Sequence, residues 1–264
     1  MNATIWSFRA FGEAGHTPVV LLHGYLGSSE SWAGVALSLA DSFYCLLPDL
    51  PGHGENSMRL GRWPSLGQWA SQLNAFLEAQ GLERVHLVGY SLGGRLALRF
   101  ALEFPQRLLS LALESASPGL RAWGERAARR KLDRERAQEL YCGEKRAFLE
   151  KWYRQDLFGF LNEAQRERLI QAGWGRDMRK MALIIQCLSP GREPSLWDSL
   201  ARLTMPVLLI GGGEDRIYHK IMEEMAQAIP KAHLRFFQGA GHNVHAFFPE
   251  EVASLLREFF LGLL

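Results

Sequence analysis

Cysteine is scarce in this chain of 264 residues, which holds three copies, at positions 45, 142 and 187. An odd number without a CxxC motif gives no sign of a disulfide framework and favours a reducing compartment. No cluster of histidine, cysteine and acidic residues has the spacing of metal ligands. The sequence therefore predicts a protein without a metal or another cofactor.

Long apolar runs are also missing, and so is a strong charge of one sign. No apolar stretch approaches the roughly 18–20 residues that are needed to span a bilayer. Residues 1–11 lack the basic segment and the apolar core of a secretory signal. With 30 basic and 28 acidic residues, the net charge of +2 is too small to suggest a nucleic-acid partner. We therefore expect a cytoplasmic protein with no membrane span.

Short apolar runs that alternate with helical patterns fill the first part of the chain, and the alternation returns near its end. Runs of this kind are typical of strands in a parallel sheet that helices cover on both faces. The predicted strands are residues 19–22, 43–47, 85–88, 108–113, 207–210 and 234–237, and the predicted helices are residues 65–79, 95–103, 217–228 and 250–260.

The stretch between these two parts reads as helix throughout and is rich in arginine and glutamate. The strands on either side of it are too few to fold alone, so we interpret the stretch as an insertion. The sequence thus predicts one α/β core, residues 1–117 and 200–264, built on a mostly parallel sheet with flanking helices. Residues 118–199 are predicted to form a helical lid over the carboxyl edge of that sheet.

A G-x-S-x-G motif stands at residues 89–93, between a predicted strand and a predicted helix. Glycines on both sides of Ser91 allow the strand and the helix to approach closely, as a strained strand-to-helix turn requires. Such a turn exposes the serine hydroxyl at the carboxyl edge of the sheet. The alternative is a tight turn with a capping serine, but the flanking elements and Gly94 favour a reactive serine.

A reactive serine needs a base, and the base needs a carboxylate that orients it. His242 follows the last predicted strand and Asp215 follows the one before, so both reach the edge that holds Ser91. The order Ser, Asp, His along the chain is that of the α/β-hydrolase fold. His245 is the rival base, and Glu114 is the rival acid.

Negative charge that develops during a reaction at this serine needs hydrogen-bond donors close by. The topology provides two backbone N–H groups, one directly after the serine and one in the loop after the first predicted strand. We assign this oxyanion hole to the N–H groups of Leu92 and Tyr25.

Several segments closely resemble the 2-succinyl-6-hydroxy-2,4-cyclohexadiene-1-carboxylate synthases of menaquinone biosynthesis, which have the α/β-hydrolase fold. They are residues 22–28 (LHGYLGS), 49–54 (DLPGHG), 88–95 (VGYSLGGR), 114–120 (ESASPGL), 194–197 (PSLW) and 239–245 (GAGHNVH). The resemblance covers nearly the whole chain. It implies a lyase that eliminates pyruvate from an enolpyruvyl-bearing cyclohexene substrate, with the serine taking a proton and forming no acyl-enzyme.

The substrate implied by this resemblance is a small anion with several carboxylates, which favours arginines in the site. Arg95 lies one helical turn beyond the reactive serine. Arg129 matches the lid arginine of the family, and Trp152 matches a pocket aromatic. We also assign His23 and Tyr90 to the substrate pocket.

The chain departs from the family pattern further along the lid. Members of the family carry another arginine at a position that aligns with Gly173 here, and Arg176 is the candidate replacement. Arg130 and Lys131 stand beside Arg129 and are its rivals for the role of lid arginine.

Two other classes of function share the same pattern. A serine hydrolase, either a carboxylesterase or a C–C bond hydrolase, would use the same triad, and a ligand receptor would need only the scaffold. The basic lid and Arg95 argue against neutral esters as substrates, and the intact Ser, Asp and His argue against a receptor. Pyruvate release measured beside ester turnover distinguishes these classes.

Overall fold

The core is a seven-stranded sheet in the order β1-β3-β2-β4-β5-β6-β7, in which β1 pairs antiparallel with β3 and the other pairs are parallel. The computed structural model describes residues 6–56, 60–61 and 63–264. The predicted α/β architecture is confirmed. The strands are β1 (Phe8–Phe11), β2 (Thr17–Leu22), β3 (Phe43–Pro48), β4 (Val85–Tyr90), β5 (Leu108–Glu114), β6 (Val207–Gly212) and β7 (Ala232–Phe237).

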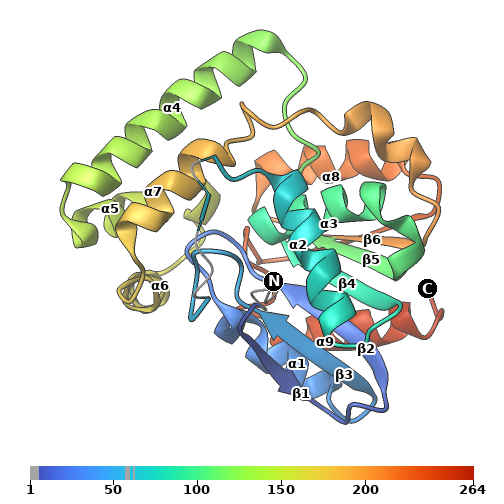
Figure 1. The fold of residues 1–264 in the computed structure, drawn as a ribbon. Helices are drawn as coiled ribbons and strands as arrows, with labels where there is room; N and C mark the ends of the chain where they lie inside the picture. The colour runs from blue at the N-terminus through green and yellow to red at the C-terminus, as the bar shows by residue number, and fades with distance from the viewer. Residues whose placement is uncertain (1–5, 57–59, 62) are drawn as a thin grey trace.

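Helices cover both faces of this sheet (Figure 1). Side chains of a strand point alternately to the two faces. In β2, Val19 and Leu21 pack in one apolar core, whereas Val20 and Leu22 pack in the other. The first core also holds α1 (Ala33–Leu39) and α9 (Pro249–Phe260), and the second holds α2 (Leu66–Ala79), α3 (Leu92–Glu103) and α8 (Arg216–Ala228).

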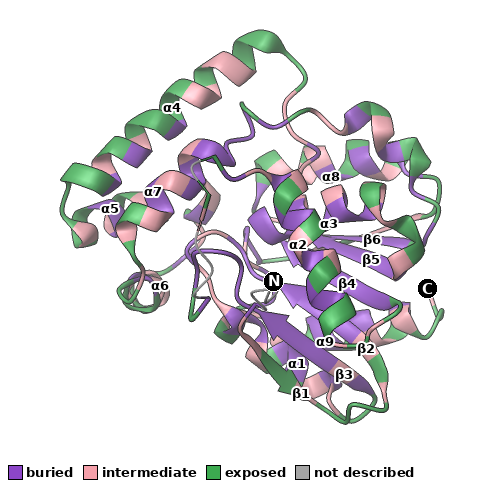
Figure 2. Ribbon diagram, in the orientation of Figure 1, coloured by how far each residue is buried: buried purple, intermediate pink, exposed green. Residues whose placement is uncertain are grey.

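Four helices between β5 and β6 form a group that we call the lid: α4 (Trp123–Cys142), α5 (Lys145–Tyr153), α6 (Glu163–Gly173) and α7 (Met178–Cys187). Figure 1 shows them at the upper left, with α4 lying along α7 and apart from the sheet. Ala137 and Leu140 of α4 are buried, while much of the outer side of α4 is exposed (Figure 2). Helix α4 therefore packs one side against its neighbours in the group and exposes the other.

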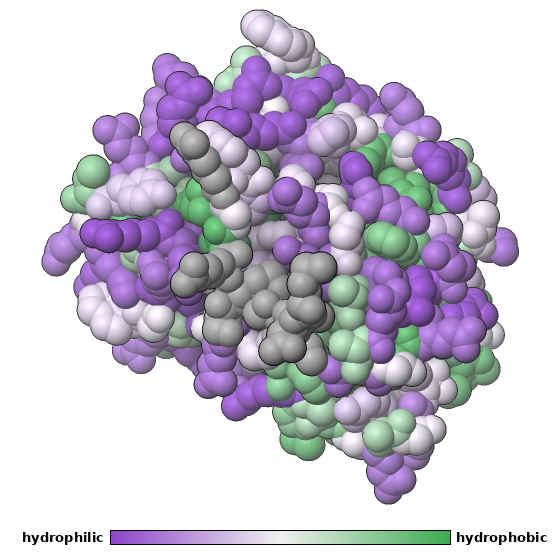
Figure 3. Space-filling view, in the orientation of Figure 1, coloured by the Kyte–Doolittle hydropathy of each residue, from purple (hydrophilic) through white to green (hydrophobic). Residues whose placement is uncertain are grey.

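Short 3-10 helices connect several of these elements, at Ser29–Trp32, Pro105–Arg107, Asp156–Phe158 and Trp197–Arg202. The face shown in Figure 3 is mostly hydrophilic, with its hydrophobic side chains in separate small groups. Among the described residues, no helix combines the length and the apolar character that crossing a membrane requires.

Candidate active site

Ser91 stands at the turn from β4 into α3, with a φ of 50° and a ψ of −107°. A non-glycine residue with a positive φ is strained, and such strain persists where the surrounding structure holds it in place. Here a Cβ on Gly89 would lie 2.5 Å from the carbonyl oxygen of Gly93, and one on Gly93 would lie 2.5 Å from that of Leu22. The two glycines thus let strand and helix pack closely enough to form the turn.

The structure brings Ser91, His242 and Asp215 into one hydrogen-bonded chain. The Oγ atom of Ser91 lies 3.1 Å from Nε2 of His242, and Nδ1 of His242 lies 2.7 Å from Oδ2 of Asp215. Asp215 caps the start of α8 by accepting the N–H of Tyr218 at 3.2 Å, which fixes its carboxylate. With Nδ1 donating to this carboxylate, Nε2 of the neutral ring is free to accept the serine proton.

The rival pair, Glu114 and His245, forms a separate buried contact. The carboxylate of Glu114 accepts the backbone N–H of Val244 at 2.7 Å, that of His245 at 3.2 Å, and Nδ1 of His245 at 2.9 Å. His245 also stacks on Trp32, with ring centroids 3.7 Å apart. Glu114 therefore holds the loop that carries His242 and does not contact the His242 ring itself.

Replacing Glu114 with glutamine should destabilise the protein, because a neutral amide replaces a buried carboxylate that accepts three donors. We expect a loss of about 2 kcal/mol in the free energy of unfolding, as is typical for hydrogen bonds to a charged group. Thermal unfolding measures the loss, with the exposed Glu83→Gln as the matched control. Equal melting temperatures for the two variants would contradict this role of Glu114.

The two proposed oxyanion donors lie where the topology requires. Leu92 is the first residue of α3, so its N–H has no acceptor within the helix. Tyr25 follows β2 in the loop that begins with His23 and Gly24. A Cβ on Gly24 would lie 2.6 Å from the ring of Tyr90, so glycine is needed for this loop to approach the turn.

A cavity of about 560 Å³ lies between the sheet edge and the lid, within the usual size range of small-molecule sites. Ser91 and His242 open into it. Its polar lining includes three guanidinium groups and two carboxylates, and the rest is mostly apolar. The charged residues in its wall are Arg95, Arg129, Arg136, Asp133 and Asp156, and its apolar residues include Leu120, Leu132, Trp152, Leu157, Ile184, Ile185, Leu188 and Ile221.

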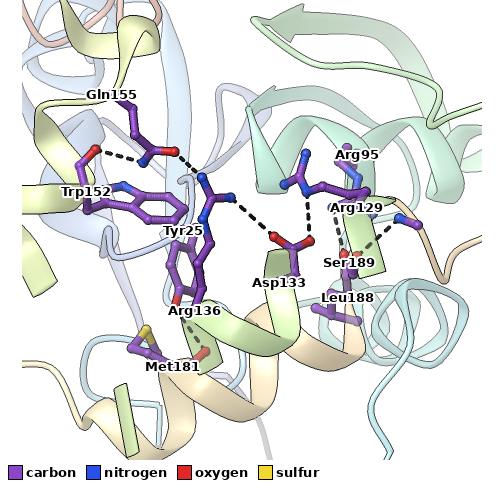
Figure 4. Close-up of polar contacts among 11 residues, drawn as sticks. Tyr25, Arg95, Arg129, Asp133, Arg136, Trp152, Gln155, Met181, Leu188 and Ser189 are labelled. Atoms are coloured by element: carbon purple, nitrogen blue, oxygen red, sulfur yellow. Dashed lines mark hydrogen bonds and ion pairs between the residues drawn. The ribbon is translucent and has the colours of Figure 1, made fainter. Parts of the chain in front are cut away.

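Three of the five predicted substrate contacts, Arg95, Arg129 and Trp152, line this cavity. Arg95 donates from Nη1 to the carbonyl oxygen of Leu188 at 2.8 Å, which ties α3 to the end of α7 (Figure 4). Burial lowers the pKa of Arg95 to about 10, so its guanidinium keeps its charge at neutral pH. These residues can therefore present positive charge and an aromatic ring to an anionic ligand.

His23 does not reach the cavity wall, and its assignment to the pocket is corrected. The ring is fully buried, its Nε2 accepts the N–H of Leu50 at 3.0 Å, and its Nδ1 donates to the carbonyl oxygen of Gly24 at 2.8 Å. Both ring nitrogens are thus used to join two loops. Tyr90 is also absent from the cavity lining, but its ring contacts that of the triad residue His242, so its assignment to the substrate pocket stays a prediction.

Buried His23 should make stability depend on pH between about 4 and 6.5. Burial lowers the pKa of His23 to about 4, so the unfolded chain binds a proton more readily in this window. The stability that the neutral ring provides is complete above pH 6.5 and is lost as the pH falls toward 4. The loss approaches about 3 kcal/mol at 1.36 kcal/mol for each pKa unit.

Denaturant unfolding of the wild type and of His23→Gln across this window tests the effect. Glutamine offers an acceptor and does not titrate, so the stability gap between the two proteins should shrink as the pH falls. A gap that stays constant from pH 7 to pH 4 would show that His23 is not buried in its neutral form.

Arg176 and Gly173 lie outside the cavity lining. Arg176 donates from Nε to the carbonyl oxygen of Leu26 at 3.0 Å, and Gly173 packs against Leu149. Arg176 therefore does not supply the contact that the aligned family arginine would make.

Sequence reasoning missed Arg136, which does line the cavity. Its signal is the spacing of seven residues from Arg129, which places both on one helix face.

No group of three histidine, cysteine or acidic side chains is placed to hold a metal ion in the part of the chain that the structure describes. Three features define an enzyme of the α/β-hydrolase type: the strained turn at Ser91, the Ser-His-Asp chain, and the helices inserted between strands of a parallel sheet. Comparison with known protein families supports this class, because residues 17–249 match the family model described as "alpha/beta hydrolase fold".

Relatives narrow this class. The chain is 34% identical over 249 residues to a putative 2-succinyl-6-hydroxy-2,4-cyclohexadiene-1-carboxylate synthase of Bacillus subtilis (strain 168), covering 93% of this chain and 90% of the relative. It is 32% identical over 252 residues to the synthase of that name from Serratia proteamaculans (strain 568), covering 95% and 96%.

Solved structures share the fold of this chain. The structure of MenH from S. aureus superposes with a TM-score of 0.90 at 26% identity and covers 97% of each chain. A thermophilic esterase from Thermogutta terrifontis gives 0.85 at 25% identity, covering 97% of this chain and 93% of that one. The chain belongs to the α/β-hydrolase family and, within it, to the family of the 2-succinyl-6-hydroxy-2,4-cyclohexadiene-1-carboxylate synthases.

Proposed function

We propose that this enzyme is a carbon–oxygen lyase of menaquinone biosynthesis. It eliminates pyruvate from 2-succinyl-5-enolpyruvyl-6-hydroxy-3-cyclohexene-1-carboxylate and yields 2-succinyl-6-hydroxy-2,4-cyclohexadiene-1-carboxylate. The observation that carries the proposal is a Ser-His-Asp chain that opens into a cavity with three guanidinium groups in its wall. Synthase relatives that match over at least 90% of this chain support it.

In the proposed mechanism Ser91 acts as the base. Its hydroxyl proton passes to Nε2 of His242, and its oxygen takes the proton from the ring carbon next to an electron-withdrawing group. The electron pair of the broken C–H bond at ring carbon 2 forms a double bond to carbon 3. The existing double bond shifts from carbons 3 and 4 to carbons 4 and 5, and the C–O bond between carbon 5 and the enolpyruvyl group breaks. The leaving enolate receives the proton from His242 and becomes pyruvate, so the balance needs no cofactor.

Asp215 and the backbone donors stabilise the charges that develop during the reaction. The carboxylate holds the His242 ring in one tautomer and stabilises the imidazolium that forms. The N–H groups of Leu92 and Tyr25 stabilise the negative charge that develops on the substrate during proton removal. Arg95 and Arg129 bind substrate carboxylates, since a guanidinium offers two parallel donors to a carboxylate. No step in this sequence attaches the substrate covalently to Ser91.

Pyruvate release tests the proposal against the alternative of a serine hydrolase. The wild-type enzyme is given the enolpyruvyl substrate with lactate dehydrogenase and NADH, and a parallel sample receives a series of nitrophenyl esters. We expect rapid NADH oxidation and slow ester turnover. Brisk ester turnover without pyruvate would favour a carboxylesterase. Such an enzyme would use the same triad, but a neutral ester would not require three arginines in the cavity wall.

We further propose that the enzyme works in the cytoplasm with a small carboxylate anion as its partner. Cys45, Cys142 and Cys187 are all free thiols, which suits a reducing compartment. Cell fractionation followed by pyruvate assay of each fraction tests this placement.

A further inference from the structure

Helix α4 presents three charged side chains to the cavity, at positions 129, 133 and 136. Spacings of four and three residues place them on one face of the helix. Arg129 and Arg136 are seven residues apart, which corresponds to about 10 Å along the axis at 1.5 Å per residue. The lid thus carries two cations at separate points along the cavity wall.

Asp133 lies between these arginines and holds both. Its carboxylate accepts Nε of Arg129 at 2.8 Å and Nη1 of Arg136 at 3.3 Å, and its side chain is 1% exposed. One carboxylate cannot neutralise two guanidiniums, so the face keeps a net positive charge. Within the described part of the chain, both Nη groups of Arg129 and part of the Arg136 guanidinium make no other hydrogen bond.

Neighbouring side chains form the setting of the Arg136 guanidinium, on the side of Asp133 away from Arg95 (Figure 4). It lies over the Trp152 ring, 5.1 Å from the ring centroid, and its Nη2 donates to Oε1 of Gln155. The amide of Gln155 in turn donates to the carbonyl oxygen of Trp152 at 2.8 Å. Such contacts fix the direction of a guanidinium before a ligand arrives, which lowers the entropy cost of binding.

The substrate of the proposed function has a group that fits this setting. Its ring carboxylate and its enolpyruvyl carboxylate lie near the reacting carbons and hence near Ser91 and Arg95. The carboxylate of the succinyl arm is separated from the ring by a ketone and two methylene groups, so it extends away from the reacting carbons. The two methylenes suit the apolar face of Trp152, and the terminal anion suits a guanidinium.

We propose that Arg136 binds the carboxylate of the succinyl arm and thereby selects substrates that carry this arm. The inference rests on the proposed function for the identity of the substrate. Arg95 and Arg129 remain the partners of the carboxylates nearer the triad. Different arginines thus bind the two ends of the substrate.

A pair of simple probes tests the contact without the reaction. 4-Oxo-4-phenylbutanoate carries the ketone and the succinyl arm on a six-membered ring, and butyrophenone is the same molecule with a methyl group in place of the carboxylate. Calorimetric titration of the wild type and of Arg136→Met gives the four dissociation constants. We expect Arg136→Met to weaken binding of the acid about tenfold or more, as for a lost charge-assisted hydrogen bond, and to change binding of butyrophenone less than about twofold.

Two further variants complete the design. Arg134→Met removes an exposed arginine from the same helix and should change neither constant. Arg136→Lys keeps the charge without the planar fork and should bind the acid with intermediate affinity, which also guards against misfolding of the methionine variant. Unchanged binding of the acid by Arg136→Met, or equal weakening for both probes, would overturn the proposal.

The reaction supplies a second readout. With the enolpyruvyl substrate, Arg136→Met should raise KM about tenfold while kcat stays within about threefold, because the contact is remote from the reacting atoms. A fall in kcat with unchanged KM would contradict a binding role. If the wild type releases no pyruvate, the proposed function fails, whereas the probe titration still decides whether Arg136 binds a succinyl carboxylate.

Discussion

Ser91→Ala is expected to lower kcat for pyruvate release by about ten-thousandfold to a millionfold, the range seen when a single triad member is removed. The hydroxyl lies 3.1 Å from Nε2 of His242 and is the group through which the substrate proton passes. Alanine leaves the turn undisturbed but lacks the hydroxyl that accepts the substrate proton and donates its own to His242. Steady-state pyruvate assays measure the loss, and titration with substrate checks that binding survives.

His242→Ala provides the partner experiment for this prediction. Residues that act as one unit give non-additive losses, so the double variant with Ser91→Ala should be no slower than the worse single variant. Exposed Ser71→Ala is the matched serine control and should keep wild-type kcat. Near-normal turnover by Ser91→Ala would remove the serine from the mechanism.

Asp215→Asn is expected to cost about a thousandfold to ten-thousandfold in kcat, as when a triad aspartate becomes an amide. The Asp215 carboxylate accepts the Nδ1 proton of His242 at 2.7 Å and so leaves Nε2 free to accept from Ser91. An asparagine that turns its amide nitrogen toward the ring favours the opposite tautomer, in which Nε2 carries the proton and cannot accept another.

The neighbouring acid gives a matched control for Asp215→Asn. Glu214→Gln removes one negative charge from the adjacent, exposed position and should leave kcat within about twofold. Comparable losses from both variants would indicate a general effect of charge, and an active Asp215→Asn would point to another carboxylate, with Glu114 the first to test.

The sequence predicted the elements that place the triad, because each depends on local patterns. Ser91 was placed by a glycine motif between a strand and a helix, and Asp215 and His242 by the ends of later strands. β1 and α1 were missed. β1 has four residues in a half-exposed pattern at the sheet edge, and α1 has seven, so neither leaves a clear apolar period.

The choice between rival residues depended on side-chain contacts that no spacing reveals. Glu114 and Asp215 both end or follow a strand at the same sheet edge, and the structure pairs Glu114 with His245. The same limit explains the correction at His23. His23 follows a strand at the same sheet edge, yet both of its ring nitrogens bond to backbone groups and the ring does not reach the cavity wall.

The lid shows the limit of alignment as a guide. Gly173 was expected to leave a gap in carboxylate recognition for which Arg176 was the candidate replacement, but Arg176 bonds to a core loop instead. Arg136, on a different helix, faces the cavity because it shares a face of α4 with Arg129. Which arginine reaches a ligand is decided by helix rotation and packing, which the residue order does not specify.

The most direct test of the account uses substrate that carries deuterium at the ring carbon from which Ser91 is proposed to take the proton. In a single turnover, pyruvate should appear more slowly from the deuterated substrate, and the intact mass of the enzyme should not change. Equal rates for the two substrates, with an added acyl mass that disappears in Ser91→Ala, would show that Ser91 attacks a carbonyl and that the proposed elimination is wrong.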